Sequence, residues 1–164
     1  MPQLVIFFGL TGSGKSHLAA RLSKETGAKH LNTDQVRDAL GLRGRYEETV
    51  KEKVYAELFS LANHFIQNDQ SVILDGTFHI EDRRNRVYEL EKKTGVKAIW
   101  IEVTCDEAIA MKRVSGKRTY SEADQKVYHK IKMESEPFTE DHLVVDTSSK
   151  PVNENIQLIK SYLQ

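Results

Sequence analysis

The stretch Gly9–Ser16 is the feature that most limits how this chain can fold. It reads Gly-Leu-Thr-Gly-Ser-Gly-Lys-Ser and fits the pattern G-x-x-x-x-G-K-[ST] without a mismatch. The apolar run Leu4–Phe8 before it predicts a buried strand, and His17–Leu22 after it predicts a helix. Glycines between a strand and a helix let successive backbone N–H groups point at one anion, which the helix dipole also attracts. The stretch therefore predicts a site for a nucleoside triphosphate.

The side chains and the backbone of this loop have separate expected roles. Lys15 is expected to reach the β- and γ-phosphates, and the Ser16 hydroxyl is expected to bind Mg²⁺. We expect ATP and Mg²⁺ as cofactors. The residues expected to cradle the phosphates before that lysine are Gly9, Thr11, Gly12, Ser13 and Gly14.

The composition fits one globular domain. The chain has 164 residues, of which 39% are hydrophobic and 29% charged, so it can bury one sizeable core. Lys plus Arg and Asp plus Glu number 24 each, and this zero net charge argues against a long electrostatic contact with nucleic acid. Cys105, the single cysteine, is expected to pack as a small hydrophobe. One thiol, no signal peptide before the first strand and no apolar run near ~20 residues predict a cytoplasmic protein without a membrane span.

Strands and helices alternate along the chain. The runs that read as strands are 4–8, 29–32, 71–75, 97–103 and 142–146, and those between them and after Pro151 read as helices, chiefly 33–40, 47–68, 82–94 and 106–114. In the longest helix one face is expected to be buried, formed by Val50, Val54, Leu58, Leu61 and Phe65. This alternation predicts an α/β fold in a single domain, 1–164, with a parallel sheet that has helices on both faces and ligands at the carboxyl ends of its strands.

Acidic residues follow the second and third expected strands, beside the phosphate loop. Asp75 ends an apolar strand, where enzymes with this loop place an acid on Mg²⁺, directly or through water. Asp34 stands at a helix start, where either it or Thr33 would cap the helix. If Thr33 is the cap, Asp34 is free to accept a proton from an acceptor hydroxyl and to orient it.

Arginines near these acids predict an acceptor side of the site. Arg37 lies one turn after Asp34 and is suited to hold a polar or anionic acceptor by forked hydrogen bonds. Arg43 and Arg45 either extend that surface or are solvated. On the helix after the third strand we expect one arginine, Arg83, to reach the acceptor, and most of the cluster Arg83, Arg84 and Arg86 to be surface residues.

A basic run around Gly116 predicts a lid over about residues 113–122. Closing such a segment brings guanidinium groups to the charge that builds on a transferring phosphoryl group, and it excludes water. Arg113, at a helix end, and Arg118, next to the expected hinge, are the best candidates for this role.

The order of these motifs resembles that of small P-loop kinases. The phosphate loop, Asn32–Arg37, Val72–Phe78 with the arginines after it, and the basic lid recur in that order in the kinase domain of polynucleotide 5′-hydroxyl kinases and in related small AAA-type predicted kinases. Zeta toxins, gluconate kinases and adenylylsulfate kinases are similar at a greater distance. Where the polynucleotide kinases commonly have an Asp-Thr-Asn-like run, Gly76 here follows Asp75, which argues against nucleic-acid repair but not against a kinase.

The resemblance implies a three-layer P-loop fold with five parallel strands in the order 2-3-1-4-5. It also implies roles for individual residues. Asp34 is the base on the acceptor hydroxyl, Arg37 holds a phosphate on the acceptor, and Arg118 contacts the donor phosphates. Arg113 supports Arg118 or the adenine. Catalysis would then rest on Lys15, Asp34 and Arg118.

Three functions compete. The first is a kinase that transfers the γ-phosphoryl group of ATP to a hydroxyl of a small molecule, a nucleotide or a nucleic-acid 5′ end. The second is an ATPase or GTPase switch, but the guanine-reading N-K-x-D run is absent from the sequence and the D-x-x-G match at Asp38–Gly41 falls on an expected helix. The third is a nucleotide-binding regulatory module without turnover, which intact Lys15, Ser16, Asp34 and Asp75 disfavour. The sequence favours the kinase.

Overall fold

Five parallel strands form the centre of the molecule. The computed structural model describes residues 1–116 and 122–164, and the side chains of these except 122–124. The strands pair in the order β2-β3-β1-β4-β5, so the expected order is confirmed. Their bounds are β1 Leu4–Phe8, β2 Lys29–Asn32, β3 Val72–Asp75, β4 Ala98–Thr104 and β5 His142–Asp146.

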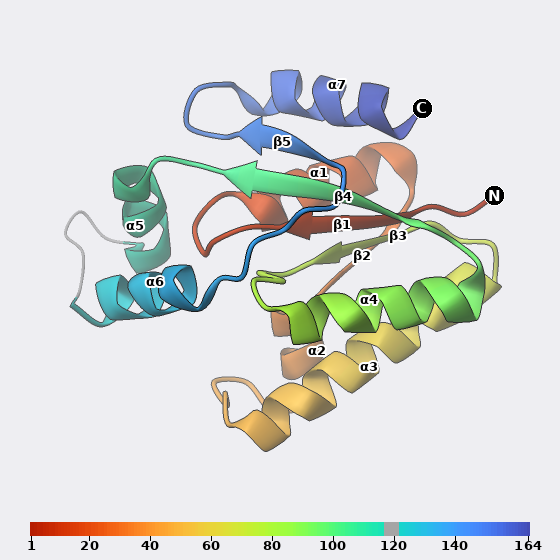
Figure 1. The fold of residues 1–164 in the computed structure, drawn as a ribbon, viewed down its shortest axis with the longest axis horizontal. Helices are drawn as coiled ribbons and strands as arrows, with labels where there is room; N and C mark the ends of the chain where they lie inside the picture. The colour runs from red at the N-terminus through yellow and green to blue at the C-terminus, as the bar shows by residue number, and fades with distance from the viewer. Residues whose placement is uncertain (117–121) are drawn as a thin grey trace.

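Helices cover both faces of this sheet. In Figure 1, α1 and α7 lie on one face, and α3 and α4 lie on the other. The helix bounds are α1 Lys15–Thr26, α2 Thr33–Ala39, α3 Glu48–Gln67, α4 Glu81–Thr94, α5 Glu107–Ser115, α6 Glu122–Glu134 and α7 Val152–Leu163. The expected architecture of a parallel sheet between two helical layers is thus confirmed.

The position of β1 in the middle of the sheet, with a core on each face, explains why its sequence is a continuous apolar run. Leu4, Ile6 and Phe8 point into the core beneath α3 and α4. Val5 and Phe7 point into the core beneath α1 and α7. All five are buried, and burying each such side chain stabilises the fold by about 1.5–3 kcal/mol. The loop that follows β1 therefore starts from a fixed point.

The buried stripe of α3 differs from the expected one beyond its first three residues. It continues through Ala62 and Ile66, whereas Leu61 and Phe65 are partly buried at its edge. Ala62 is fully buried, four residues after Leu58 and on the same face of the helix. The sequence pattern favoured the larger residues, and packing against the sheet selected the smaller one.

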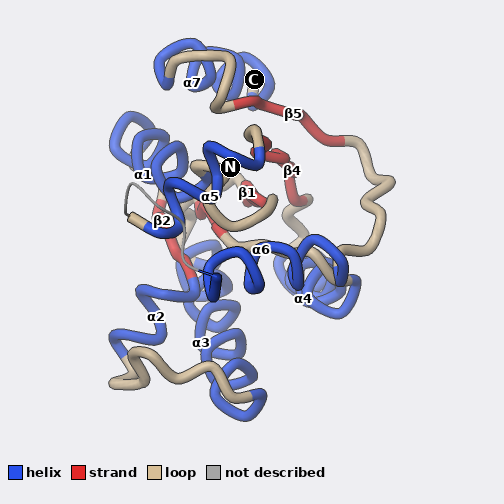
Figure 2. Tube along the Cα trace, turned by 90° about the vertical axis from the view of Figure 1, so that its left-hand side faces the viewer, coloured by secondary structure: helices blue, strands red, loops and turns tan. Residues whose placement is uncertain are grey.

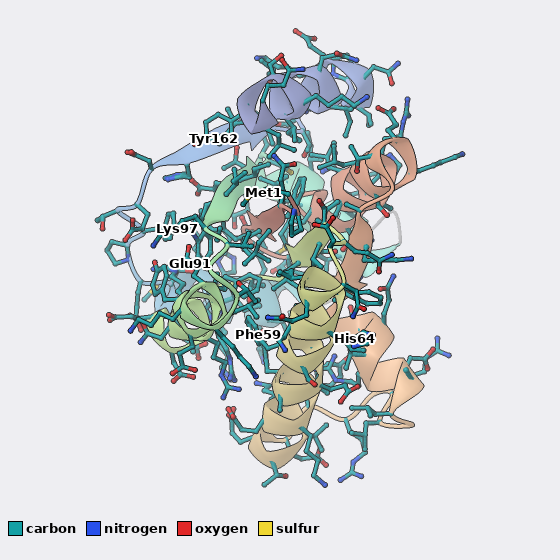
Figure 3. The ribbon with its side chains drawn as sticks, turned by 90° about the vertical axis from the view of Figure 1, so that its right-hand side faces the viewer. Met1, Phe59, His64, Glu91, Lys97 and Tyr162 are labelled. Carbon is teal, nitrogen blue, oxygen red and sulfur yellow. The ribbon has the colours of Figure 1, made fainter. Side chains whose placement is uncertain are left out.

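The two edges of the sheet have different surroundings. Figure 2 looks onto the carboxyl edge, where α5 and α6 lie in front of the strand ends. Figure 3 looks onto the amino edge, where Lys97 Nζ lies 3.5 Å from Glu91 Oε2. The phosphate loop and the acids expected in the site follow strand ends at the carboxyl edge. No helix among the described residues is long and apolar enough to cross a bilayer.

Candidate active site

Glycines give the loop between β1 and α1 its shape. Gly9, Gly12 and Gly14 have positive φ angles of 143°, 81° and 99°. A Cβ on Gly9 would lie 2.3 Å from the Val103 carbonyl oxygen, and one on Gly12 would lie 2.4 Å from that of Ala110. The loop is therefore pressed against β4 and α5 in a conformation that side chains at these positions would prevent.

Lys15, the first residue of α1, is buried inside this loop. Its Nζ donates a hydrogen bond to the Leu10 carbonyl oxygen at 3.0 Å. Burial lowers the pKa of Lys15 to about 8, although the nearby charges of Asp75 and Asp34 oppose the shift. The Ser13 hydroxyl is also buried and lacks a hydrogen-bond partner within the described part of the chain. A buried cation within a glycine loop fits a bound phosphate chain.

Asp75, at the end of β3, is held by two residues of β2. Its Oδ2 lies 2.8 Å from His30 Nε2, and it accepts from Asn32 Nδ2 at 3.4 Å. The pairing of β2 with β3 places Asn32 directly beside Asp75. His30 and Asn32 were not singled out from the sequence. The signal for them was available, because alternate residues of one strand share a face and the sheet order makes β2 the neighbour of β3.

Oxygen ligands suited to Mg²⁺ are present at this edge. A hydroxyl from Ser16 and a carboxylate from Asp75 are the hard donors that Mg²⁺ prefers, and such sites take one or two protein ligands with the rest supplied by phosphates and water. Across residues 1–116 and 122–164, no group of three or more His, Cys, Asp or Glu side chains is placed to hold a metal. The donor set fits a metal that arrives with a triphosphate.

Asn32 caps α2, so neither of the two expected caps is correct. Its Oδ1 accepts from the Gln35 backbone N–H at 2.8 Å. Thr33 and Asp34 lie in the first turn of the helix instead. The carboxylate of Asp34 is exposed, and its Oδ1 accepts from Arg37 Nη1 at 3.0 Å. Asp34 is thus free of capping, as a proton acceptor would need to be.

Arg37 is buried, unlike most arginines on a short helix. Its Nε donates to the Arg45 carbonyl oxygen at 3.0 Å, and its guanidinium lies 4.5 Å from the centre of the Tyr46 ring. Arg37 and Asp34 border a surface cavity of about 420 Å³. Other residues that line this cavity are Gln35, Asp38, Arg43, Gly44 and Tyr46.

The expectation that most of the α4 arginine cluster would be surface residues is wrong, because Arg83 and Arg84 are buried. The start of α4 packs against α3 on one side and against the segment after α6 on the other, so adjacent arginines enter two different contacts. Arg83 Nη1 lies 3.0 Å from Glu52 Oε1, and its guanidinium lies 4.2 Å from the Tyr55 ring centre. Arg86 pairs with Glu52 nearer the surface.

Arg84 binds backbone rather than an acceptor. Its guanidinium donates to the carbonyl oxygens of Phe78, His79, Glu136 and Pro137 at 2.7–3.3 Å. It therefore ties the segment that follows α6 to the loop that follows β3.

Tyr55 on α3 was missed by the sequence reasoning and joins the two arginine sites. Burial raises the pKa of Tyr55, and the positive charges of Arg83 and Arg37 oppose that shift. Arg83 lies over the Tyr55 ring, whereas Arg37 lies over the ring of Tyr46. No sequence signal marked Tyr55, because its role depends on how α3 lies against α2 and α4.

At the other side of the loop, Arg113 of α5 contacts the loop backbone. Its Nη1 donates to the carbonyl oxygens of Gly12 and Ser13 at 3.3 and 3.2 Å, and to Thr147 Oγ1 at 2.9 Å. Thr147 was also missed, since it follows β5 and reaches the loop only through the sheet order. Arg118 lies outside the described residues, as do all of residues 117–121 of the expected lid.

The sequence matches the family model described as AAA domain over residues 4–138. This range is most of the chain and contains the phosphate loop, Asp34, Asp75 and Arg113. The chain therefore belongs to this AAA domain family. No curated protein is similar enough in sequence to count as a match.

Solved structures of kinases share the fold. The chain is similar to APS kinase from Mycobacterium tuberculosis, solved with AMPPNP and APS, with a TM-score of 0.76 and 18% identity over 99% of this chain and 97% of that one. A gluconokinase from Sinorhizobium meliloti has a TM-score of 0.71 and 13% identity over 99% and 91%. A sugar kinase from Janibacter sp. has a TM-score of 0.73 and 14% identity over 99% and 95%. These likenesses establish a P-loop kinase-like fold, and the resemblance to polynucleotide kinases stays a prediction.

Proposed function

We propose that this chain is an ATP-dependent kinase that transfers the γ-phosphoryl group to an alcohol hydroxyl, with Asp34 as the base. The observation that carries the proposal is the placement of three groups on three adjacent strand ends. The phosphate loop follows β1, Asp75 ends β3, and the Asp34–Arg37 pair follows β2. A donor site, a metal ligand and an acceptor-side carboxylate are what phosphoryl transfer requires.

The proposed chemistry assigns one task to each of these residues. Lys15 binds the β- and γ-phosphates, and Asp34 accepts the proton of the acceptor hydroxyl as its oxygen attacks the γ-phosphorus. A new oxygen–phosphorus bond forms while the bond to the bridging oxygen breaks, and ADP leaves with that electron pair. Mg²⁺, held by Ser16 and Asp75, would neutralise charge on the phosphates.

Arginines would complete the site from two sides. Arg37 and Arg83 are proposed to bind the acceptor, and both are buried with an ordered geometry that limits the entropy lost on binding. Arg113 already contacts the phosphate loop. Arg118 is proposed to close over the phosphates from a lid at about residues 113–122, within a single domain of 1–164. The acceptor is a small molecule, a nucleotide or a nucleic-acid 5′ end.

A transfer assay with γ-labelled ATP tests the proposal. The protein is incubated with a panel of nucleosides, sugars and 5′-hydroxyl oligonucleotides, and the label is followed into products. A kinase moves the label to at least one alcohol. Label that appears only as inorganic phosphate, at a rate that no acceptor changes, would support the alternative of an ATPase or regulatory module.

A further inference from the structure

A larger cavity of about 560 Å³ lies beneath α5 and α6, beside the start of the phosphate loop. Gly9 and Leu10 of the loop and Thr77 after β3 line it on one side, and Tyr128 and Lys132 of α6 line it on the other. Figure 2 shows α5 and α6 in front of the strand ends, and Phe8, Val103 and Thr104 at those ends line the cavity. The volume is typical of a site for a small molecule.

The walls of this cavity are largely apolar and aromatic. Phe8, Leu10 and Val103 contribute from the sheet side, and Tyr128 and Phe138 contribute from the side of α6. The rings of Phe8 and Phe138 are 4.7 Å apart and form part of one aromatic cluster. Surfaces of this kind bind flat rings better than they bind polyols, because a ring buries apolar area and a polyol must lose its water.

Charged side chains at the cavity disfavour an anion. Among the described residues that line it, there are two cations, Arg84 and Lys132, and three carboxylates, Glu102, Glu107 and Glu136. Arg84 donates four hydrogen bonds to backbone carbonyls, and Lys132 Nζ lies 3.6 Å from Glu107 Oε2. The described part of the lining therefore has an excess of negative charge, and both of the cations in it already have partners.

Neutral polar groups remain to bind a ligand. The Ser13 hydroxyl lines the cavity, is buried, and has no hydrogen-bond partner in the described structure. Thr77 Oγ1 lies 2.8 Å from His79 Nδ1 on the wall next to the loop. Hydroxyls and a ring nitrogen are suited to the polar edge of an uncharged ligand.

We propose that this cavity receives the body of the acceptor, and that the acceptor is an uncharged alcohol with a flat ring, of about nucleoside size. The inference rests on the proposed function for the identity of the reacting hydroxyl. Since β3 separates β2 from β1, the Gly9 end of the cavity lies roughly 10 Å from the end of β2. A molecule of that length can place its ring in the cavity and its hydroxyl on the side of Asp34.

Binding is measured by calorimetry with saturating AMPPNP, so that the donor site is filled. Two matched pairs serve as probes: uridine with uridine 3′-phosphate, and benzyl alcohol with 4-(hydroxymethyl)benzoate.

Trp100 is the only tryptophan, and its ring lies 4.8 Å from that of Phe138, so its fluorescence reports ligands in this cavity. We expect a neutral member to bind and to change Trp100 emission, and its charged partner to bind at least about tenfold more weakly. Ribose, which has no flat ring, should give no signal. Binding by neither neutral probe, or equal binding by a charged partner, would overturn the proposal.

Two variants locate the site. Ala110→Leu adds volume to the cavity wall, and Ala56→Leu makes the same change in a separate groove between α3 and α4. Ring binding should weaken by about tenfold or more in Ala110→Leu and stay unchanged in Ala56→Leu. If Ala110→Leu does not fold, as judged by AMPPNP binding, Tyr128→Ala removes an aromatic wall and should weaken ring binding similarly. Unchanged ring binding in the folded variant contradicts the placement.

The readout separates this inference from the proposed function. Ring binding without label transfer would leave the cavity assignment intact and refute the kinase. Label transfer to a sugar or an anionic acceptor, without ring binding, would support the kinase and refute the cavity assignment.

Discussion

Lys15 is a basic side chain that the fold buries against a neutral carbonyl. Its Nζ bonds to the Leu10 oxygen, and burial lowers the pKa of this group to about 8. In the unfolded chain a lysine titrates near 10.4. Folding at neutral pH therefore costs free energy, because it buries the charged ammonium group that the phosphates would need. Lys15 lowers the stability of the protein and supplies a cation for binding.

Replacing Lys15 with methionine should stabilise the nucleotide-free protein at pH 7 by up to about 3 kcal/mol, from the pKa difference of about 2.5 units. Between pH 8 and about 10.5 the unfolded lysine holds its proton while the folded one has lost it, so the free energy of unfolding of the wild type rises with pH. The gap in unfolding free energy between the variant and the wild type therefore closes over this range. Urea unfolding of both proteins at pH 7 and pH 10.5 measures this gap. A gap that stays constant across this range would contradict the assigned cause.

The same Lys15→Met variant should lose ATP binding by about 100-fold or more, because a charge-assisted contact to the phosphates is removed. Lys97→Met is the matched control, since Lys97 is exposed at the opposite edge of the sheet (Figure 3). Calorimetry with AMPPNP compares the two. Equal loss in both variants, or no loss in Lys15→Met, would place the triphosphate elsewhere.

At the level of elements, β2 orients the acid that ends β3. His30 bonds to Asp75 Oδ2, so the neighbouring strand fixes which carboxylate oxygen remains for other contacts. Partners of this kind typically change metal affinity by about 10–100-fold when they are removed.

His30→Ala should therefore raise the Mg²⁺ concentration needed for AMPPNP binding by about tenfold or more. The exposed His64 of α3, labelled in Figure 3, provides the control variant His64→Ala. Binding titrations at several Mg²⁺ concentrations measure the shift without requiring turnover. An unchanged Mg²⁺ dependence in His30→Ala would show that its contact with Asp75 does not position a metal ligand.

Arg84 connects two elements that are far apart in the sequence. Its removal would leave the carbonyl oxygens of Phe78, Glu136 and Pro137 without this donor, while that of His79 keeps the Glu136 backbone N–H as a partner. Arg84→Ala should lower the free energy of unfolding by about 3 kcal/mol or more. Arg86→Ala on the same helix removes a more exposed ion pair and should cost less than about 1 kcal/mol. Comparable losses in urea unfolding would contradict the anchoring role of Arg84.

The succession of strands and helices was predictable because it depends on local sequence patterns, whereas the order of the strands in the sheet came from the resemblance to small P-loop kinases. Apolar runs such as Leu4–Phe8, and the glycines that end helices, can be recognised from short stretches of consecutive residues. The burial of Arg83 and Arg84 was not predictable, because it depends on α4 packing against α3 and against the segment after α6. The Asn32 cap was missed for a different reason, since Asn, Thr and Asp in succession all cap helices well.

For the whole molecule, the sheet order gathers the site. Asp34, Asp75 and the phosphate loop are expected in one place from the rule that ligands bind at the carboxyl ends of parallel strands, and the structure places their segments at neighbouring strand ends. His30, Tyr55 and Thr147 reach this region through pairings between distant segments. The contacts of Tyr55 and Thr147 follow from the fold and leave no pattern in a single sequence, whereas the contact of His30 could have been inferred from the strand order and the alternation of residues along β2.

The most direct test of the central claim compares Asp34→Asn with Asp141→Asn, an exposed residue just before β5. Both variants, and the wild type, are assayed for AMPPNP binding and for label transfer to an acceptor. We predict that Asp34→Asn retains nucleotide binding and loses transfer by about 10²–10⁴-fold, the usual contribution of a general base, while Asp141→Asn matches the wild type. Normal transfer by Asp34→Asn would contradict the claim that Asp34 faces the acceptor.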